Sequence, residues 1–304
     1  MIHPLPSGTR DVLPDEMREL RAITDALRAT FEAHGYGEVA TPVLEHEDVL
    51  RRGGGGAEPG YRVVDDHGAV LSLRPDMTVP IARLVATRFG DEPLPHRLHY
   101  AAHVYRAVRP HRGQMREFLQ AGIELVGAPG APGTAEALTV LCRALEAVGL
   151  RDFRVAVGDA ALFPALMRER DVPPDVQRRM LRELAQRDLV GLEREARAAG
   201  APELARLPRG GVEVLDGLGV AGGGMRELHG LLDDDVAARV LFDAGLARGM
   251  GYYTGAIFDV LSPSVGEPLG GGGRYDELLG RFGRDLPAVG FALGVELLHG
   301  ALAA

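Results

Sequence analysis

The stretch over residues 103–127 constrains the fold most strongly, because a basic segment is followed at once by an alternating apolar one. Its four arginines are Arg106, Arg109, Arg112 and Arg116. A turn over 110–113 predicts a strand, a basic turn and a returning strand. On the returning strand Gln120 and Glu124 share one polar face. This layout fits a pocket for a zwitterion or a phosphate, or an ordinary amphipathic hairpin with a solvated turn.

Composition excludes several classes of function. The net charge of -9 over 304 residues argues against a nucleic-acid surface spread over the whole chain. All basic residues are arginine, so P-loop and Schiff-base lysine chemistry are excluded. The single cysteine, Cys142, excludes an internal disulfide and a cysteine-rich metal site. The histidines form no ligand-spaced cluster, and we expect neither a metal nor a cofactor.

The ends and apolar runs of the chain bear on its location. Residues 1–14 are polar and proline-rich, unlike a signal peptide. No apolar run is long enough to cross a membrane. We therefore expect a soluble, cytoplasmic protein.

Periodicity predicts the elements in order. Acidic residues after Pro14 predict a helix that ends near residue 35 or 37. The expected strands and hairpins cover 39–44, 61–73, 98–126, 153–158 and 252–260, with further helices over 79–88 and 134–148 and a strand-to-helix segment over 287–304. Residues 160–245 predict a mostly helical insertion.

Two short motifs leave alternatives open. Asp76, in LRPDMT before a predicted helix, is either a helix cap or a ligand. The glycine run over 270–273 allows close approach of the backbone to a ligand, or forms a flexible turn.

Several motifs in order resemble the catalytic core of class II aminoacyl-tRNA synthetases, and among them histidyl-tRNA synthetase. They are GTRDVLP, LRPDMT, YRAVRPHRGQMREFLQAGIELVG, ARGMGYYTGAIFDV, GGGGRYDELL and PAVGFALGVELL. The resemblance covers about 1–127 and 246–300. It implies an α+β fold, an antiparallel sheet flanked by helices, that dimerises through the core. We expect this core over 1–159 and 246–304, the helical insertion over 160–245, and no anticodon-binding domain.

The same resemblance implies a set of histidine contacts. Asp76 and Gln120 would bind the α-amino group, with Thr78 beside them. Glu124 would hold an imidazole nitrogen. Charge-assisted bonds of this kind match the groups of a histidine zwitterion. The remaining implied residues are Arg106 and Arg248 for the carboxylate or another anion, and Tyr252, Tyr253 and Tyr275 around the ring.

Three departures from the synthetase motifs point away from catalysis. Leu297 stands where motif 3 carries the arginine that holds ATP, and losing such a contact costs several kcal/mol of transition-state stabilisation. Gln114 and Gly251 replace an arginine and an aspartate. The chain also ends after motif 3. A chain that keeps the histidine pocket but lacks the ATP-binding arginine and the tRNA-binding domain is predicted to be a histidine sensor.

Such a sensor resembles the regulatory subunits of ATP phosphoribosyltransferase, which carry Met within LRPDMT. This resemblance implies no catalytic residues, no tRNA, and a hetero-oligomer in which the chain activates a short catalytic subunit and transmits feedback inhibition by histidine. Two alternatives remain open: a histidine-adenylating or aminoacylating enzyme, and a paralogue with another partner, such as a kinase regulator or a modification factor.

Overall fold

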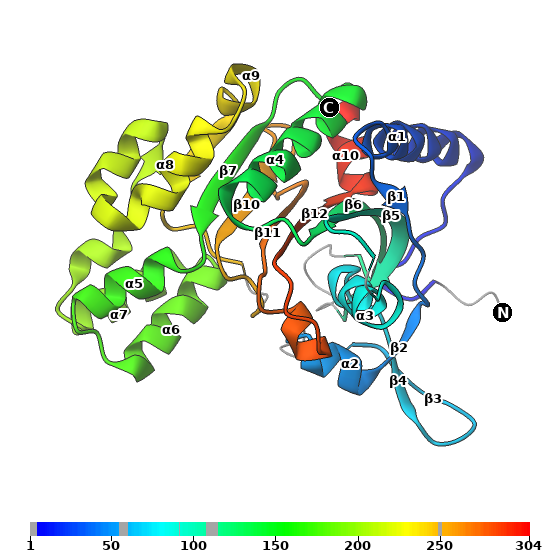
Figure 1. Ribbon diagram of the computed structural model, residues 1–304, viewed down its shortest axis with the longest axis horizontal. Helices are drawn as coiled ribbons and strands as arrows, with labels where there is room; N and C mark the ends of the chain where they lie inside the picture. The colour runs from blue at the N-terminus through cyan, green and yellow to red at the C-terminus, as the bar shows by residue number, and fades with distance from the viewer. Residues whose placement is uncertain (1–4, 55–59, 91, 108–114, 249–250) are drawn as a thin grey trace.

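The computed structural model describes residues 5–54, 60–90, 92–107, 115–248 and 251–304 (Figure 1). Within them nine strands form one sheet, in the order β1-β5-β6-β12-β11-β10-β7-β9-β8. Their bounds are β1 Gly37–Glu38, β5 His96–Tyr105, β6 Glu117–Val126, β7 Arg154–Asp159, β8 Arg209–Gly210, β9 Val240–Asp243, β10 Ala256–Leu261, β11 Gly270–Arg274 and β12 Ala288–Gly294. The predicted helix-flanked sheet is confirmed, although the pairs β1–β5 and β7–β9 are parallel.

One face of this sheet is covered by three helices, which lie together at the top of Figure 1. They are α1 Pro14–Ala33, α4 Gly130–Ala147 and α10 Val295–Ala303. Helix α1 begins with proline at its first turn and two acidic residues, which suit the positive end of a helix dipole. Its buried side chains recur at helical spacing: Leu20, Ile23, Thr24, Leu27 and Phe31. They pack into the main core with Ile123 and Leu141.

A smaller sheet, in the order β2-β4-β3, lies beside the main one. Its strands are β2 Leu44–His46, β3 Arg62–Val64 and β4 Val70–Leu73, and it is accompanied by α2 Glu47–Arg52 and α3 Thr78–Arg88. The hairpin predicted over 61–73 is confirmed. The strand predicted over 39–44 is wrong, because β1 ends at Glu38 and β2 begins at Leu44. Pro42 cannot donate to a ladder, and the carbonyls of Thr41 and Pro42 instead accept hydrogen bonds from Arg74.

Two predictions near the end of the chain are also corrected. Residues 252–255 form no strand, and β10 begins only at Ala256. The glycine run over 270–273 is not a flexible turn, because it forms strand β11 between β12 and β10. After β11 the chain forms a turn and the short 3-10 helix η3, Leu279–Phe282. Strand β12 and helix α10 follow, which confirms the strand-to-helix segment predicted over 287–304.

Residues 160–245 lie on the left of Figure 1 and are mostly helical. They contain α5 Leu162–Glu169, α6 Pro174–Ala185, α7 Leu189–Ala198, α8 Gly223–Gly230, α9 Asp234–Ala237 and the 3-10 helices η1 Pro202–Ala205 and η2 Val212–Gly222. They also contribute β8 and β9 to the main sheet, and their buried leucines belong to the main core cluster. The division of the chain at 160 and 245 stays a prediction. No helix within the described residues is long and apolar enough to cross a membrane.

Arg274, at the end of β11, connects the sheet to the start of helix α4 through side-chain hydrogen bonds. Its buried guanidinium donates to Thr134 Oγ1 (3.1 Å) and to the carbonyls of Ala128 (3.1 Å) and Gly130 (2.7 Å). It also pairs with Asp276 at 2.8 Å. These bonds bind the turn before α4 and fix the backbone just before Tyr275.

Replacing Arg274 by alanine leaves these buried acceptors unpaired. We expect Arg274→Ala to lower the free energy of unfolding by about 3 kcal/mol, because a buried acceptor left without its donor costs about 1–3 kcal/mol. Urea denaturation measures this difference. Arg178→Ala is the matched control, because Arg178 is exposed on α6 and its side chain makes no hydrogen bond or ion pair with the described residues. It should change stability by less than ~0.5 kcal/mol. Equal effects of the two variants would contradict the role given to Arg274.

Candidate functional site

The candidate site lies on the face of the main sheet that α1, α4 and α10 leave uncovered. Strand β6 alternates as predicted, with Ala121, Ile123 and Leu125 in the core beneath the helices. Gln120 and Glu124 therefore point to the opposite face. There a second apolar cluster joins β5, α3 and the tyrosines that precede β10 and follow β11.

Glu124 is the centre of this site, and its side chain is 1% exposed. Its carboxylate accepts a hydrogen bond from Thr78 Oγ1 (2.8 Å) and another from the Tyr275 hydroxyl. Burial raises the pKa of Glu124 to about 8; these two bonds lower it, and the nearby Asp76 charge raises it. Gly290 lies directly opposite on β12, where any Cβ would overlap the Glu124 carboxylate. The glycine is therefore required for the carboxylate to lie where it does.

Three tyrosines form an aromatic wall beside Glu124. The ring centroids of Tyr252 and Tyr253 lie 4.8 Å apart, and those of Tyr252 and Tyr275 lie 5.7 Å apart. Tyr253 and Tyr275 are 6.5 Å apart in an edge-to-face arrangement. Burial raises the pKa of all three hydroxyls, so they remain neutral near neutral pH. The wall can pack against a flat ring and supply neutral donors.

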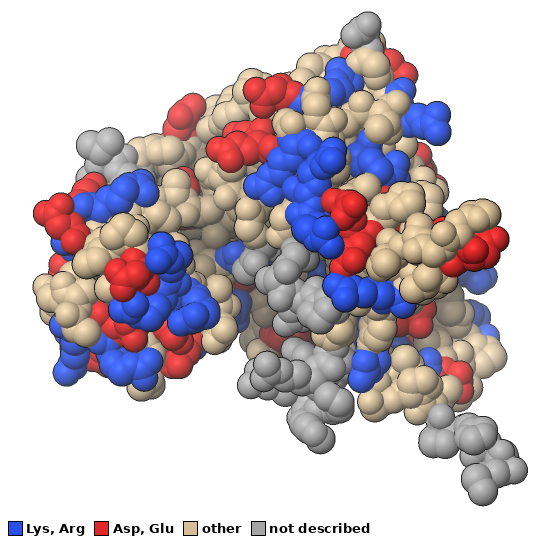
Figure 2. Space-filling view, turned by 90° about the horizontal axis from the view of Figure 1, so that it is seen from below, with Lys and Arg blue, Asp and Glu red and all other residues tan. Residues whose placement is uncertain are grey.

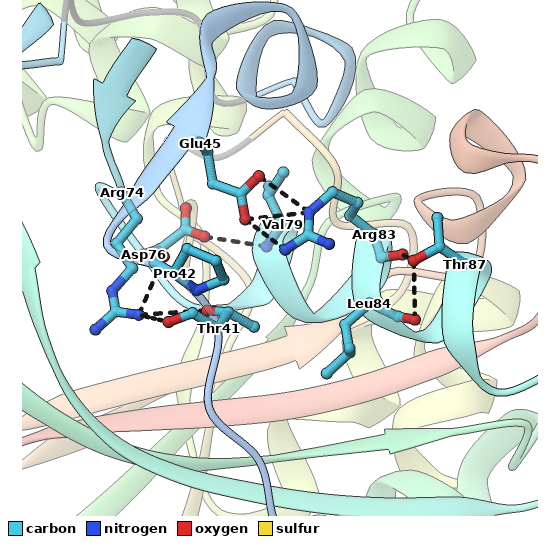
Figure 3. Close-up of polar contacts among 9 residues, drawn as sticks. All are labelled: Thr41, Pro42, Glu45, Arg74, Asp76, Val79, Arg83, Leu84 and Thr87. Atoms are coloured by element: carbon cyan, nitrogen blue, oxygen red, sulfur yellow. Dashed lines mark hydrogen bonds and ion pairs between the residues drawn. The ribbon is translucent and has the colours of Figure 1, made fainter. Parts of the chain in front are cut away.

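Asp76 lies just before α3, and Figure 3 shows its carboxylate turned toward the backbone of Val79. Its Oδ1 accepts a hydrogen bond from the Val79 amide at 3.1 Å, so it caps the helix. Burial raises the pKa of Asp76, opposed by backbone hydrogen bonds and by the charge of Arg106. Two contacts hold the backbone around Asp76 and helix α3 in place. Arg83 pairs with the buried Glu45 at 2.7 Å, and Arg74 donates to the Thr41 carbonyl at 2.6 Å.

Gln120 is 8% exposed, and its side-chain carbonyl has no hydrogen-bond partner within the described residues. An unpaired buried carbonyl is costly. Gln120, Gly122 and Glu124 follow one another on the same face of β6, so the carbonyl lies near Glu124 and can accept a hydrogen bond from a donor on a ligand. An ammonium group is such a donor.

The predicted arginines separate into different roles. Arg106 donates to the Pro75 carbonyl (3.0 Å) and lies 5.0 Å from the Phe118 ring centroid, beside Asp76. Arg116 donates to the Ser7 carbonyl and holds the N-terminal arm. Arg248 pairs with Asp259 and lies 5.8 Å from the Tyr253 ring centroid. Three predicted positions, Arg109, Arg112 and Gln114, lie outside the described residues.

The structure thus brings Thr78, Glu124 and the three tyrosines into direct contact, with Asp76 and Arg106 at one side and Arg248 at the other. Sequence reasoning missed Tyr100, which is 1% exposed and lies opposite Gly122 in the β5–β6 ladder. A Cβ at Gly122 would lie 2.7 Å from the Tyr100 hydroxyl, which places that hydroxyl over the floor of the site. Alternation along β5 could have found it, because Leu98, in the same alternate series, pairs with Glu124.

Within the described ranges no three His, Cys, Asp or Glu side chains gather in a way that could hold a metal ion. The groups present are two buried carboxyl groups and an amide carbonyl, which accept hydrogen bonds, together with hydroxyls and aromatic rings. This set suits a small zwitterion that carries an ammonium group and a planar ring.

Comparison with known proteins agrees with this arrangement. A family model described as histidyl-tRNA synthetase matches residues 8–298. The ATP phosphoribosyltransferase regulatory subunit of Symbiobacterium thermophilum is 40% identical over 99% of this chain and 82% of its own length. That of Moorella thermoacetica is 39% identical over 97% of this chain and 80% of its own length. The chain belongs to the ATP phosphoribosyltransferase regulatory subunits, a histidyl-tRNA synthetase-like family.

Solved structures place these regulatory subunits in the class II fold. An ATP phosphoribosyltransferase regulatory subunit/histidyl-tRNA synthetase from Bacillus halodurans C superimposes with a TM-score of 0.90 at 32% identity, over 99% of this chain and 84% of that one. Histidyl-tRNA synthetase from Nostoc sp. PCC 7120 shares the fold with a TM-score of 0.82 at 23% identity, over 100% of this chain and 76% of that one. The predicted fold class is confirmed.

The raised pKa of Glu124 predicts a specific dependence of stability on pH. Between the unfolded pKa near 4.5 and about 8, the folded protein keeps a proton that the unfolded chain has lost, so ionisation opposes folding as the pH rises. We expect Glu124→Gln, which has no such proton, to gain stability relative to the parent by about 1 kcal/mol per pH unit across pH 5.5–7.5. Urea denaturation of both proteins at several pH values measures the difference. A difference that does not vary with pH would show that Glu124 is ionised throughout.

Proposed function

We propose that this regulatory subunit binds free L-histidine in the pocket around Glu124 and passes its occupancy to a short-form catalytic subunit of ATP phosphoribosyltransferase. Membership of the family assigns the chain a regulatory role in histidine biosynthesis. The observation that carries the rest is the buried Glu124, held by Thr78 and Tyr275 beside an aromatic wall, with an unpaired carbonyl on Gln120.

Histidine fits these groups one by one. Its imidazole N–H would donate to Glu124, and its ring would pack against Tyr252, Tyr253 and Tyr275. Its ammonium group would donate to Gln120 and lie near the Asp76 carboxylate, while Arg106 or Arg248 would neutralise its carboxylate. A positive imidazolium or ammonium group brought next to Glu124 favours the ionised carboxylate, so binding would release the proton that burial retains.

Helix α10, which covers the other face of the sheet, lacks one feature of the synthetase motif. Leu297 is half-buried on α10, where its apolar side chain packs against the main core, and it offers no charge to a triphosphate. This supports a subunit without catalysis of its own, whose effect on the reaction comes through its partner. Regulation then requires a coupling free energy between the histidine pocket and the catalytic subunit.

Self-association through the core is part of the proposal. The small sheet exposes a group of apolar side chains: Val43 39%, Leu44 41%, Val63 42%, Val64 66% and Val70 41%. Val64 and Val70 are paired across the β3–β4 ladder and share one face, and exposed apolar side chains of this kind favour an interface. A dimer would bury them, and the hetero-oligomer would be built on that dimer.

The test uses the assembled complex of this chain with a short-form catalytic subunit. Gln120→Ala and Glu124→Ala should each raise the histidine concentration for half-inhibition by about tenfold or more, since a charge-assisted bond contributes about 1.5–3 kcal/mol. Activation of the catalytic subunit without histidine should stay near the parent level. Gln186→Ala, at an exposed glutamine after α6, is the matched control. Unchanged inhibition in both pocket variants would place the histidine site elsewhere.

The competing function is histidine adenylation, which the retained Arg106 and Arg248 favour. Histidine-dependent exchange of pyrophosphate into ATP by this chain alone separates the two. We expect histidine to bind, as seen by calorimetry, with no exchange above background, because Leu297 replaces the ATP-holding arginine. Measurable exchange that Glu124→Ala abolishes would make the chain an enzyme.

A further inference from the structure

A cleft of about 440 Å³ lies between the insertion and the main sheet, apart from the Glu124 pocket. Figure 2 shows the lower face hollowed between the lobe on the left, which carries α6 and α7, and the rest of the molecule. Ala156 and Asp259, which are paired across β7 and β10, belong to its wall, and the end of α6, the start of α7 and residues 205–209 close it from the other side. Its volume is that of a site for a small organic molecule.

The lining combines apolar side chains with an excess of positive charge. The apolar part is formed by Leu184, Leu189, Leu192, Leu207, Leu246 and Leu261. Three arginines and two aspartates complete it: Arg187, Arg206, Arg209, Asp243 and Asp259. One of these aspartates, Asp259, is also bound by Arg248 from outside the cleft. The guanidinium groups therefore exceed the carboxylates that face them.

The arginines of the cleft are incompletely paired. Arg206 has no ion pair or side-chain hydrogen bond within the described residues. Arg209 approaches Asp243 only to 3.5 Å, beyond a normal hydrogen bond. Arg187 reaches Asp259 at 3.0 Å, and its side chain is 60% exposed. Its left-handed backbone, with φ 57°, is that of an ordinary helix C-terminus, where the Asp188 amide donates to the Glu183 carbonyl.

We propose that this cleft is a second ligand site, which takes a small molecule with an apolar or flat body and a phosphate or carboxylate group. The leucines receive the body, and Arg206 and Arg209 bind the anionic group with Arg187. Because Arg187 already binds Asp259, the ligand and the Asp259 carboxylate compete for its guanidinium.

Asp259 also connects the cleft to the histidine pocket, and this part rests on the function proposed above. The buried Asp259 carboxylate uses one oxygen for Arg187 and the other for Arg248. Arg248 in turn lies over Tyr253, whose ring packs against Tyr275. Loss of the Asp259 charge therefore frees Arg187 for a ligand. It also removes the ion pair that holds Arg248 beside the tyrosine wall, where the hydrogen bond to the Phe258 carbonyl (3.0 Å) remains.

The test titrates the full chain with phenyl phosphate, inorganic phosphate and benzyl alcohol by calorimetry. Phenyl phosphate should bind saturably, inorganic phosphate more weakly because it has no apolar body, and benzyl alcohol not measurably. Arg206→Ala should weaken phenyl phosphate binding by about tenfold, the loss of one charge-assisted contact. Arg178→Ala, an exposed arginine on α6 outside the cleft, should bind like the parent. No saturation up to ~10 mM, a concentration corresponding to very weak binding, or equal affinity of the parent and Arg206→Ala, would overturn the site.

Asp259→Asn supplies a signature that simple damage to the fold does not produce. It should tighten phenyl phosphate binding by several-fold, because Arg187 is released, and weaken histidine binding by ~5-fold or more, within the usual range of coupling between sites. Weakening of both would overturn the competition for Arg187. If the parent protein binds no histidine at all, the function proposed above fails, while the phenyl phosphate titrations still decide whether the cleft is a site.

Discussion

The buried carboxylate of Glu124 is the constraint on which the rest of the site depends. A carboxylate removed from water requires donors or a cation, and here a hydroxyl from α3 and a phenol after β11 supply two of the donors. Both donors must arrive at fixed positions, which explains why the start of α3 is anchored by Arg74, Asp76 and the Glu45–Arg83 pair, and why Arg274 is fastened to α4. Burial raises the pKa of Glu124 more than these two hydrogen bonds lower it. A cation brought beside the carboxylate would favour its ionised form.

Glycines complete the pocket by leaving space rather than by providing contacts. Gly290 is opposite Glu124, and a Cβ there would overlap the carboxylate. Gly271 lies opposite Asp259, where a Cβ would overlap the Arg248 guanidinium. Gly290 lies in the cross-strand row of Glu124 and Gly271 in that of Asp259, and each leaves space above the sheet for the charged group beside it.

Residues 160–245, the predicted insertion, give the proposed regulation a physical path. A pocket that only binds histidine cannot influence a partner unless two arrangements of the assembly differ in their contacts with the ligand. Asp259 is shared between an arginine of the insertion and an arginine at the tyrosine wall, so its pairing depends on both sides. The cleft beside it places a second set of arginines where another ligand can shift that balance.

The sequence by itself determined the alternation of β6, which assigns Gln120 and Glu124 to one face, and the order of motifs that identifies the family. It also predicted α1, the β5–β6 hairpin and the β12–α10 segment, since each depends on local periodicity. Local patterns did not decide the strand at 39–44, where Pro42 and Arg74 replace ladder bonds, nor the nature of 270–273, which flanking strands turn into β11. They left the role of Asp76 open between helix cap and ligand, and the structure shows the cap bond to the helix over 78–88.

Only the tertiary structure decided which groups meet, because Tyr275 reaches Glu124 across 151 positions of the chain and Arg187 reaches Asp259 across 72. Contacts between residues so distant in sequence depend on the order of strands in the sheet, and no local periodicity encodes that order.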